Sequence, residues 1–235
     1  MSMKNICKLI LCLMTFSAAF AVVGDETLST ITVSGEGRAS APPDMAIVQT
    51  GVTTRGDSAS RALAENNTAM ERVMDVLRQM GLQKKDIQTS GFKVQPEFDY
   101  KSRQQPPMIL GYRVTNGIIV KMRDIEKVAT LLDGLIQAGS NQISGIRFTF
   151  EDMSTLQDQA RQKAYQDAHA RAELYARAAN VRLGKILRIS EGPVQMPVSP
   201  GMHRLAAAES VAKVPIAVGE NEIRATVNVV FTVVN

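Results

Sequence analysis

Hydrophobic and polar residues alternate over several stretches of the chain, and each such stretch predicts a β-strand with one buried face. The clearest stretch is 223–233, where Ile, Ala, Val and Phe occupy every second position. This long terminal strand would be a hazard at a sheet edge unless another segment pairs with it or covers it. Shorter alternating stretches predict further strands from Leu28 onward, and over 45–54, 87–100, 112–121, 146–150 and 185–190.

Two stretches with apolar residues at steps of three and four predict amphipathic helices. The first follows Asp57-Ser58, a favourable N-cap pair, and ends at Gly81, a typical C′ residue. The second follows Asp124, which we expect to cap it, and stops at Gly139. Its inward-facing positions are Ile125, Val128, Leu131, Leu132, Leu135 and Ile136.

A third and longer helix begins with Ser154–Gln157, which has the S-x-x-Q form of a capping box, and extends to about Asn180. Its apolar stripe is rich in alanine. Such small side chains let another backbone approach closely, whereas the simpler explanation is that alanine favours helices. Both interpretations stay open. The stripe consists of Leu156, Ala160, Ala164, Ala168, Ala172, Tyr175 and Ala179.

The predicted order is β-β-α-β-β-α-β-α-β-β. Strands adjacent in sequence favour antiparallel pairing, so we expect an α+β fold in which three main helices pack on antiparallel sheets. A helix followed by a short strand occurs twice, at Met80–Val94 and Asn180–Ser190, which suggests two similar halves.

The first residues are typical of a secretory signal peptide. Lys4 and Lys8 precede an apolar run over 9–20, and Ala19-Phe20-Ala21 supplies the small residues of a cleavage site after Ala21. A run of this length is too short for a membrane anchor, because about 30 Å of hydrocarbon must be crossed. The sequence thus divides into a signal, residues 1–21, and one domain, residues 22–235.

Export changes the charge and removes the thiols. Cys7 and Cys12 are the two cysteines, and both lie in the predicted signal, so the exported chain forms no disulfide. The signal holds two of the 27 basic residues and none of the 23 acidic ones, which lowers the net charge from +4 to +2. Without a block of Lys and Arg, nucleic acid is a poor candidate partner. No second apolar run approaches the length of a membrane span.

Few residues suggest chemistry. Gly35-Glu36-Gly37 resembles the start of a phosphate-binding loop, but Ser40 replaces the last glycine and prolines follow, so we interpret it as a turn. His169 and Glu173 lie one helical turn apart, yet zinc needs three or four ligands. The acidic pairs Glu97 with Asp99 and Glu151 with Asp152 fit a solvated surface. We therefore assign no catalytic, cofactor-binding or metal-binding residue.

The proline-rich stretch 192–213 raises a copper hypothesis. Met196, Met202 and His203 carry thioether and imidazole groups that suit copper, although methionine in loops often serves only as adaptable packing.

Several segments, in this order along the chain, resemble the SIMPL-domain family. They are ITVSGEG at 31–37, PDMA at 43–46, QP at 95–96, GYRV at 111–114, PIAVGEN at 215–221 and VNVVF at 227–231. The resemblance implies an α+β fold, a periplasmic or outer-surface location and self-association. It also implies a physiological link to oxidative stress, and it supplies no catalytic residues.

Our leading hypothesis is therefore a periplasmic, non-enzymatic homo-oligomer with a role in envelope or oxidative-stress defence. The alanine stripe and the terminal strand are the contact surfaces that it predicts. The alternative is a periplasmic carrier of copper or an unidentified small ligand, with the loops at 95–108 and 192–213 closing over the cargo.

Overall fold

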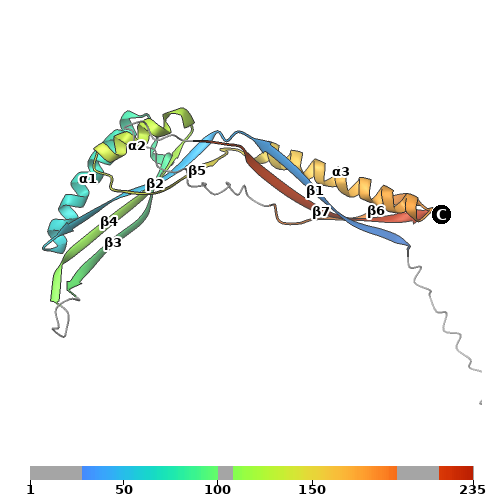
Figure 1. Ribbon diagram of the computed structural model, residues 1–235, viewed down its shortest axis with the longest axis horizontal. Helices are drawn as coiled ribbons and strands as arrows, with labels where there is room; N and C mark the ends of the chain where they lie inside the picture. Colours follow the sequence, from blue (N-terminus) through green and yellow to red (C-terminus); the bar gives the residue numbers. More distant parts are fainter. Residues whose placement is uncertain (1–27, 100–107, 195–216, 235) are drawn as a thin grey trace, which may run out of the picture.

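The computed structural model describes residues 28–99, 108–194 and 217–234. It contains two antiparallel sheets that follow one another along an elongated molecule, each with helices on one face (Figure 1). The order of strands and α-helices is the predicted one, and the α+β fold is confirmed. The predicted signal peptide with its cleavage site after Ala21 lies outside the described residues, as do Met196, Met202 and His203.

The first sheet has the order β1-β7-β6 and carries the third helix. Its strands are β1 (Thr30–Ala41), β6 (Arg182–Glu191) and β7 (Asn221–Val234), and its helix is α3 (Ser154–Ala178). The terminal strand β7 is central, with β1 on one side and β6 on the other, so the expectation of an exposed terminal edge is wrong. The alternation of apolar and polar residues predicted which face of β7 is buried, but it gave no information about which strands lie beside β7.

The second sheet has the order β3-β4-β2-β5 and carries the other two helices. Its strands are β2 (Met45–Gly56), β3 (Ile87–Asp99), β4 (Met108–Met122) and β5 (Gln142–Thr149). The helices are α1 (Ala59–Gln79) and α2 (Val128–Gln137), and short 3-10 turns precede β3 (η1, Lys84–Asp86) and α2 (η2, Ile125–Lys127).

The connectivity supports the two similar halves. Strand β1, helix α3 and strands β6 and β7 form a β-α-β-β unit whose last strand lies between the other two. Strand β2, helix α1 and strands β3 and β4 repeat this arrangement, again with all pairs antiparallel. The second unit is inserted into the first between β1 and α3, and β5 is added beside β2.

The helix ends test the capping predictions. Ser58 caps α1, accepting a hydrogen bond from the Arg61 N–H, and Gly81 ends it with φ +79°. At α2 the residues after Asp124 form the 3-10 turn, so the helix begins only at Val128. The predicted capping box is wrong, because Ser154 already lies in α3 and the Asp152 carboxylate accepts from its N–H and Oγ–H.

The inward-facing positions of two helices also need correction. Ile136 is exposed and not part of the apolar face of α2. On α3, Tyr175 and Ala179 lie outside the buried stripe, which continues through Ala176. The buried residues keep a strict step of four from Ala160 to Ala176, whereas the prediction changed to a step of three at Tyr175 and so moved to a neighbouring, exposed face.

Each sheet has its own core. The α3 alanines pack against Val33, Val229 and Phe231 in the first sheet. In the second sheet, α1 and α2 enclose Val48, Val52, Val120 and other aliphatic residues. Asn66, which interrupts the apolar stripe of α1, is fully buried and donates from Nδ2 to the Val52 carbonyl at 3.0 Å.

Candidate interaction surfaces

Helix α3 packs closely on β1. Gly35 and Gly37 lie inside β1 and face the helix, so the prediction of a turn at Gly35-Glu36-Gly37 is wrong. A Cβ added to Gly35 would come within 2.1 Å of the Ala164 carbonyl oxygen, and one on Gly37 within 1.9 Å of the Ala160 carbonyl oxygen. The glycines are therefore required for close approach and not for a turn.

The same packing closes the outer edge of β1. Charged side chains at every fourth position of α3 hydrogen-bond its outward backbone groups. Lys163 Nζ donates to the Arg38 carbonyl at 3.0 Å, and Arg171 Nη1 donates to the Ser34 carbonyl at 3.0 Å. Between them, the Glu36 N–H donates to Asp167 Oδ2 at 2.8 Å. An edge whose backbone groups are already bonded is a poor template for another strand.

This arrangement answers the question about the alanine stripe. Ala160, Ala164, Ala168 and Ala172 are fully buried against the protein's own sheet. Close backbone approach is thus their role, but within one chain. The stripe is not available as a contact surface between copies, and that part of our hypothesis is wrong.

Strand β6, at the opposite edge of the first sheet, is open. Within the described residues it pairs only with β7. Its apolar side chains Ile186, Leu187 and Ile189 are all exposed, because α3 lies over β1 and β7 instead. Ile186 and Ile189 are opposite Phe231 and Val229, which are buried under α3, so both isoleucines belong to the helix side of the sheet.

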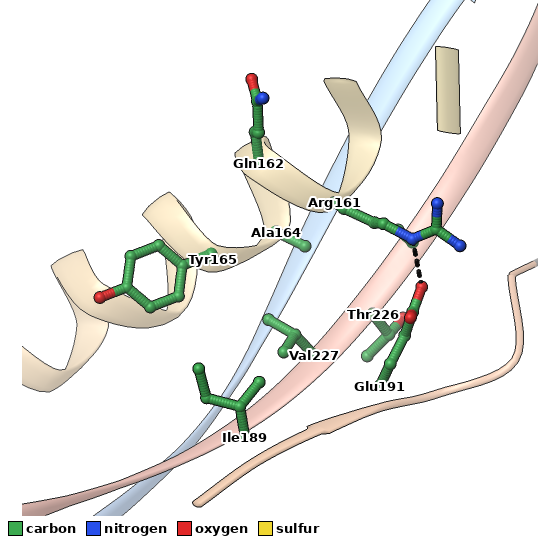
Figure 2. A pocket seen from close by; sticks show the side chains of 9 residues that line it. Arg161, Gln162, Ala164, Tyr165, Ile189, Glu191, Thr226 and Val227 are labelled. Atoms are coloured by element: carbon green, nitrogen blue, oxygen red, sulfur yellow. Dashed lines mark hydrogen bonds and ion pairs between the residues drawn. The ribbon is translucent and has the colours of Figure 1, made fainter. Parts of the chain in front are cut away.

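A groove of about 400 Å³ runs between α3 and this edge. Tyr165 on the helix, Ile189 on β6 and Val227 on β7 border the same space (Figure 2). At one end Arg161 Nε donates to Glu191 Oε1 at 2.7 Å, and Asp158 also accepts from the guanidinium. The hydrogen bond with Glu191 is the main cause that raises the pKa of Arg161.

A second exposed apolar surface lies at the free end of β3 and β4. These strands project beyond the helices, as the lower left of Figure 1 shows. The surface combines large side chains from both strands, and we call it the β3–β4 apolar end. Its members are Phe98, Met108, Ile109 and Leu110, each between 36% and 65% exposed, and Phe98 is directly opposite Ile109.

Beside the β3–β4 apolar end, Glu97 forms ion pairs with two arginines. Its Oε1 accepts from Arg113 and, at 3.1 Å, from Arg55 Nε, so one carboxylate joins β3 to both β4 and β2. Partial burial raises the pKa of Glu97, but the hydrogen bonds from the two guanidinium groups outweigh it. The net result is a pKa below the ordinary 4.5.

The other residues singled out in the sequence do not converge on a site. His169 Nδ1 lies 3.7 Å from Glu173 Oε1, and the imidazole also packs edge-on against Phe231. Glu36 is exposed and lies 3.6 Å from Arg38. No group of three or more metal-ligating side chains occurs within 28–99, 108–194 and 217–234.

The remaining acidic residues serve the structure. Glu151 accepts from Arg123 Nε at 2.7 Å, and the same guanidinium bonds Asp86, a buried carboxylate, at 2.9 Å. Asp152 caps α3 through Ser154, whose backbone and side-chain hydrogen bonds lower the pKa of that carboxyl. No helix of the described part of the chain is long and apolar enough to cross a membrane.

Sequence reasoning missed both exposed apolar surfaces. In Lys185–Ser190 the signal was present as Ile186, Leu187 and Ile189, three apolar residues within four positions. Such crowding departs from a period of two and indicates a bulged strand with apolar side chains on both faces. The pairing of β6 with β7 indeed shifts register on both sides of Ile186.

Comparisons with known proteins agree on one family. Residues 31–231 match the SIMPL family, described as a protein of unknown function (DUF541). The chain is 37% identical to the 26 kDa periplasmic immunogenic protein of Brucella melitensis, over 86% of this chain and 84% of that protein. It is 27% identical to the uncharacterized protein YggE of Edwardsiella ictaluri, over 77% of this chain and 75% of that protein. YggE of Escherichia coli K12 is 26% identical over 68% and 64%.

Proposed function

Because the chain belongs to the SIMPL family, we propose that it acts in the periplasm as a non-enzymatic protein that assembles with copies of itself. A periplasmic location is supported by the name of the Brucella relative and by the signal-like first residues. A non-enzymatic role is proposed because the sequence contains no recognisable catalytic motif.

The observation that carries self-assembly is the β3–β4 apolar end. Four large exposed apolar side chains adjoin one another there in the strand register, although exposed apolar residues on a monomeric protein are usually scattered singly. Every copy carries the same surface, so contact between copies would bury it on both partners at once. The alternative occupant, a different protein, would leave the purified chain monomeric.

Light scattering coupled to size exclusion on residues 22–235 tests this proposal. We expect a discrete mass that is a multiple of the chain mass for the unmodified protein. Leu110→Lys places a charge in the apolar end and is expected to shift the protein to monomer. Leu174→Lys is the matched control, because Leu174 is similarly exposed but lies on α3. A monomer for all three proteins would refute the proposal.

We further propose that the assembled protein contributes to the defence of the envelope against oxidative stress. Residues 22–235 contain no cysteine, so a protein cleaved after Ala21 has no thiolate with which to remove peroxide. We infer a physical role that depends on assembly. Survival of a deletion strain in peroxide should be restored by the unmodified gene and by Leu174→Lys but not by Leu110→Lys. Equal rescue by all three would refute this role.

A further inference from the structure

We propose that the open edge of β6 and the groove beside α3 together bind an extended peptide segment of another polypeptide. The segment would add to the first sheet as a strand beside β6. It would carry apolar residues at alternate positions and acidic residues between them. This surface lies in the other half of the molecule from the β3–β4 apolar end, so the inference goes beyond the proposed function.

The two edge strands of the first sheet differ in whether their outward backbone groups are hydrogen-bonded. Along β1, Lys163, Asp167 and Arg171 occupy the outward backbone groups. Along β6, no strand within the described residues takes the corresponding position. One edge is therefore closed by hydrogen bonds from α3, whereas the described part of the chain leaves the outward backbone groups of the other edge to a peptide strand.

The groove supplies the second component of such a site. In β-strand addition, backbone hydrogen bonds provide affinity and pockets for alternate side chains provide specificity. The groove opens on the helix side of β6, where the side chains of an added strand would point at every second residue. Tyr165, Ile189 and Val227 border it, and they offer mainly apolar contacts to a side chain entering from that strand.

The charges on β6 indicate which residues should occupy the intervening positions of the added peptide strand. Strand β6 contains Lys185 and Arg188, and its single acid, Glu191, is already paired with Arg161. Arg188 is opposite Val230, on the face of the sheet that carries no helix. Residues of an added strand that point to this face would lie near Arg188, and acidic side chains there would complement its charge.

A synthetic fluorescent peptide of nine residues, with Leu or Val at odd positions and Glu or Asp at even positions, tests the site by anisotropy. The titrated protein carries Leu110→Lys, so that self-assembly does not enter the result. We expect saturable binding that Ile189→Ala weakens by about tenfold, since the variant gives up burial of most of an isoleucine side chain. Leu174→Ala, an exposed leucine outside the groove, should leave it unchanged.

Two modified peptides separate this mode of binding from others. A peptide with N-methyl groups on the backbone amides facing β6 should lose binding, because strand pairing needs those N–H groups. A peptide with Lys at the even positions should bind more weakly than the acidic one. Equal binding of the N-methylated peptide would show a groove for apolar small molecules and overturn the proposal. Absence of binding by the acidic peptide would also overturn it, whatever the oligomeric state of the unmodified protein.

Discussion

Gly35 and Gly37 hold the first half of the molecule together by having no side chain. Each lies so close to backbone atoms of α3 that an added Cβ would clash with them. Backbone atoms cannot move aside as the end of a flexible side chain can. Gly35→Ala and Gly37→Ala should each lower the free energy of unfolding by about 1–3 kcal/mol, the range for overpacked cores. Urea denaturation measures this loss.

Gly145→Ala is the matched control for these substitutions. Gly145 also lies in a strand, but nothing stands within 4 Å of the position of its added Cβ. We expect unchanged or slightly raised stability, since alanine restricts the unfolded chain. If Gly35→Ala were as harmless as Gly145→Ala, the close contact of α3 with β1 would be refuted.

Glu97 makes the projecting strands sensitive to acid. Its pKa is lower in the folded protein than the ordinary 4.5, so its ion pairs with Arg55 and Arg113 stabilise the fold above that pH. The contribution is lost as the pH falls below 4.5 and through the lowered folded value. The difference in urea midpoint between the unmodified protein and Glu97→Gln should therefore be present at pH 7 and shrink toward zero in acid. A difference independent of pH would contradict this assignment.

At the scale of elements, the sequence predicted which segments form strands and helices but not which strands are neighbours. Alternation in 223–233 records that one face is buried, and that holds equally for an edge strand and a central one. Gly35 and Gly37 were misread because a pair of glycines is commoner in turns, and only the position of α3 explains them. Ile186 and Ile189 were interpreted as ordinary strand residues. Their exposure depends on which strands α3 covers, and the sequence does not show this.

Helix α3 protects β1 from pairing with other chains. Replacing Lys163, Asp167 and Arg171 together by Ala would free the Ser34 and Arg38 carbonyls and the Glu36 N–H. We expect this variant to aggregate at temperatures where the unmodified protein stays dispersed, with a dye specific for cross-β structure as the readout. Replacement of Asp158, Glu173 and Arg177 by Ala, which removes charges of α3 that do not bond β1, should leave dispersion intact. Aggregation of both variants alike would contradict a specific role for the edge.

At the scale of the whole molecule, the nested repeat separates the functions that we propose. Each β-α-β-β unit leaves its third element, β3 or β6, at an edge with exposed apolar side chains. The repeat could not be established from the sequence, because the two units share connectivity and not a recognisable motif. The equivalent strands differ in what surrounds them. Strand β6 is accompanied by a groove and basic residues, whereas β3 contributes to a broad apolar end that suits contact between copies.

The central claim is that the β3–β4 apolar end becomes buried between copies. The rate of alkylation of a thiol at position 110 tests it most directly, because residues 22–235 contain no other cysteine. Leu110→Cys should react slowly at concentrations where light scattering gives a multiple mass, and quickly once dilution yields monomer. Ser40→Cys, on the polar face of β1, should react quickly at both concentrations. A thiol at position 110 that reacts equally fast in the oligomer and in the monomer would contradict the account.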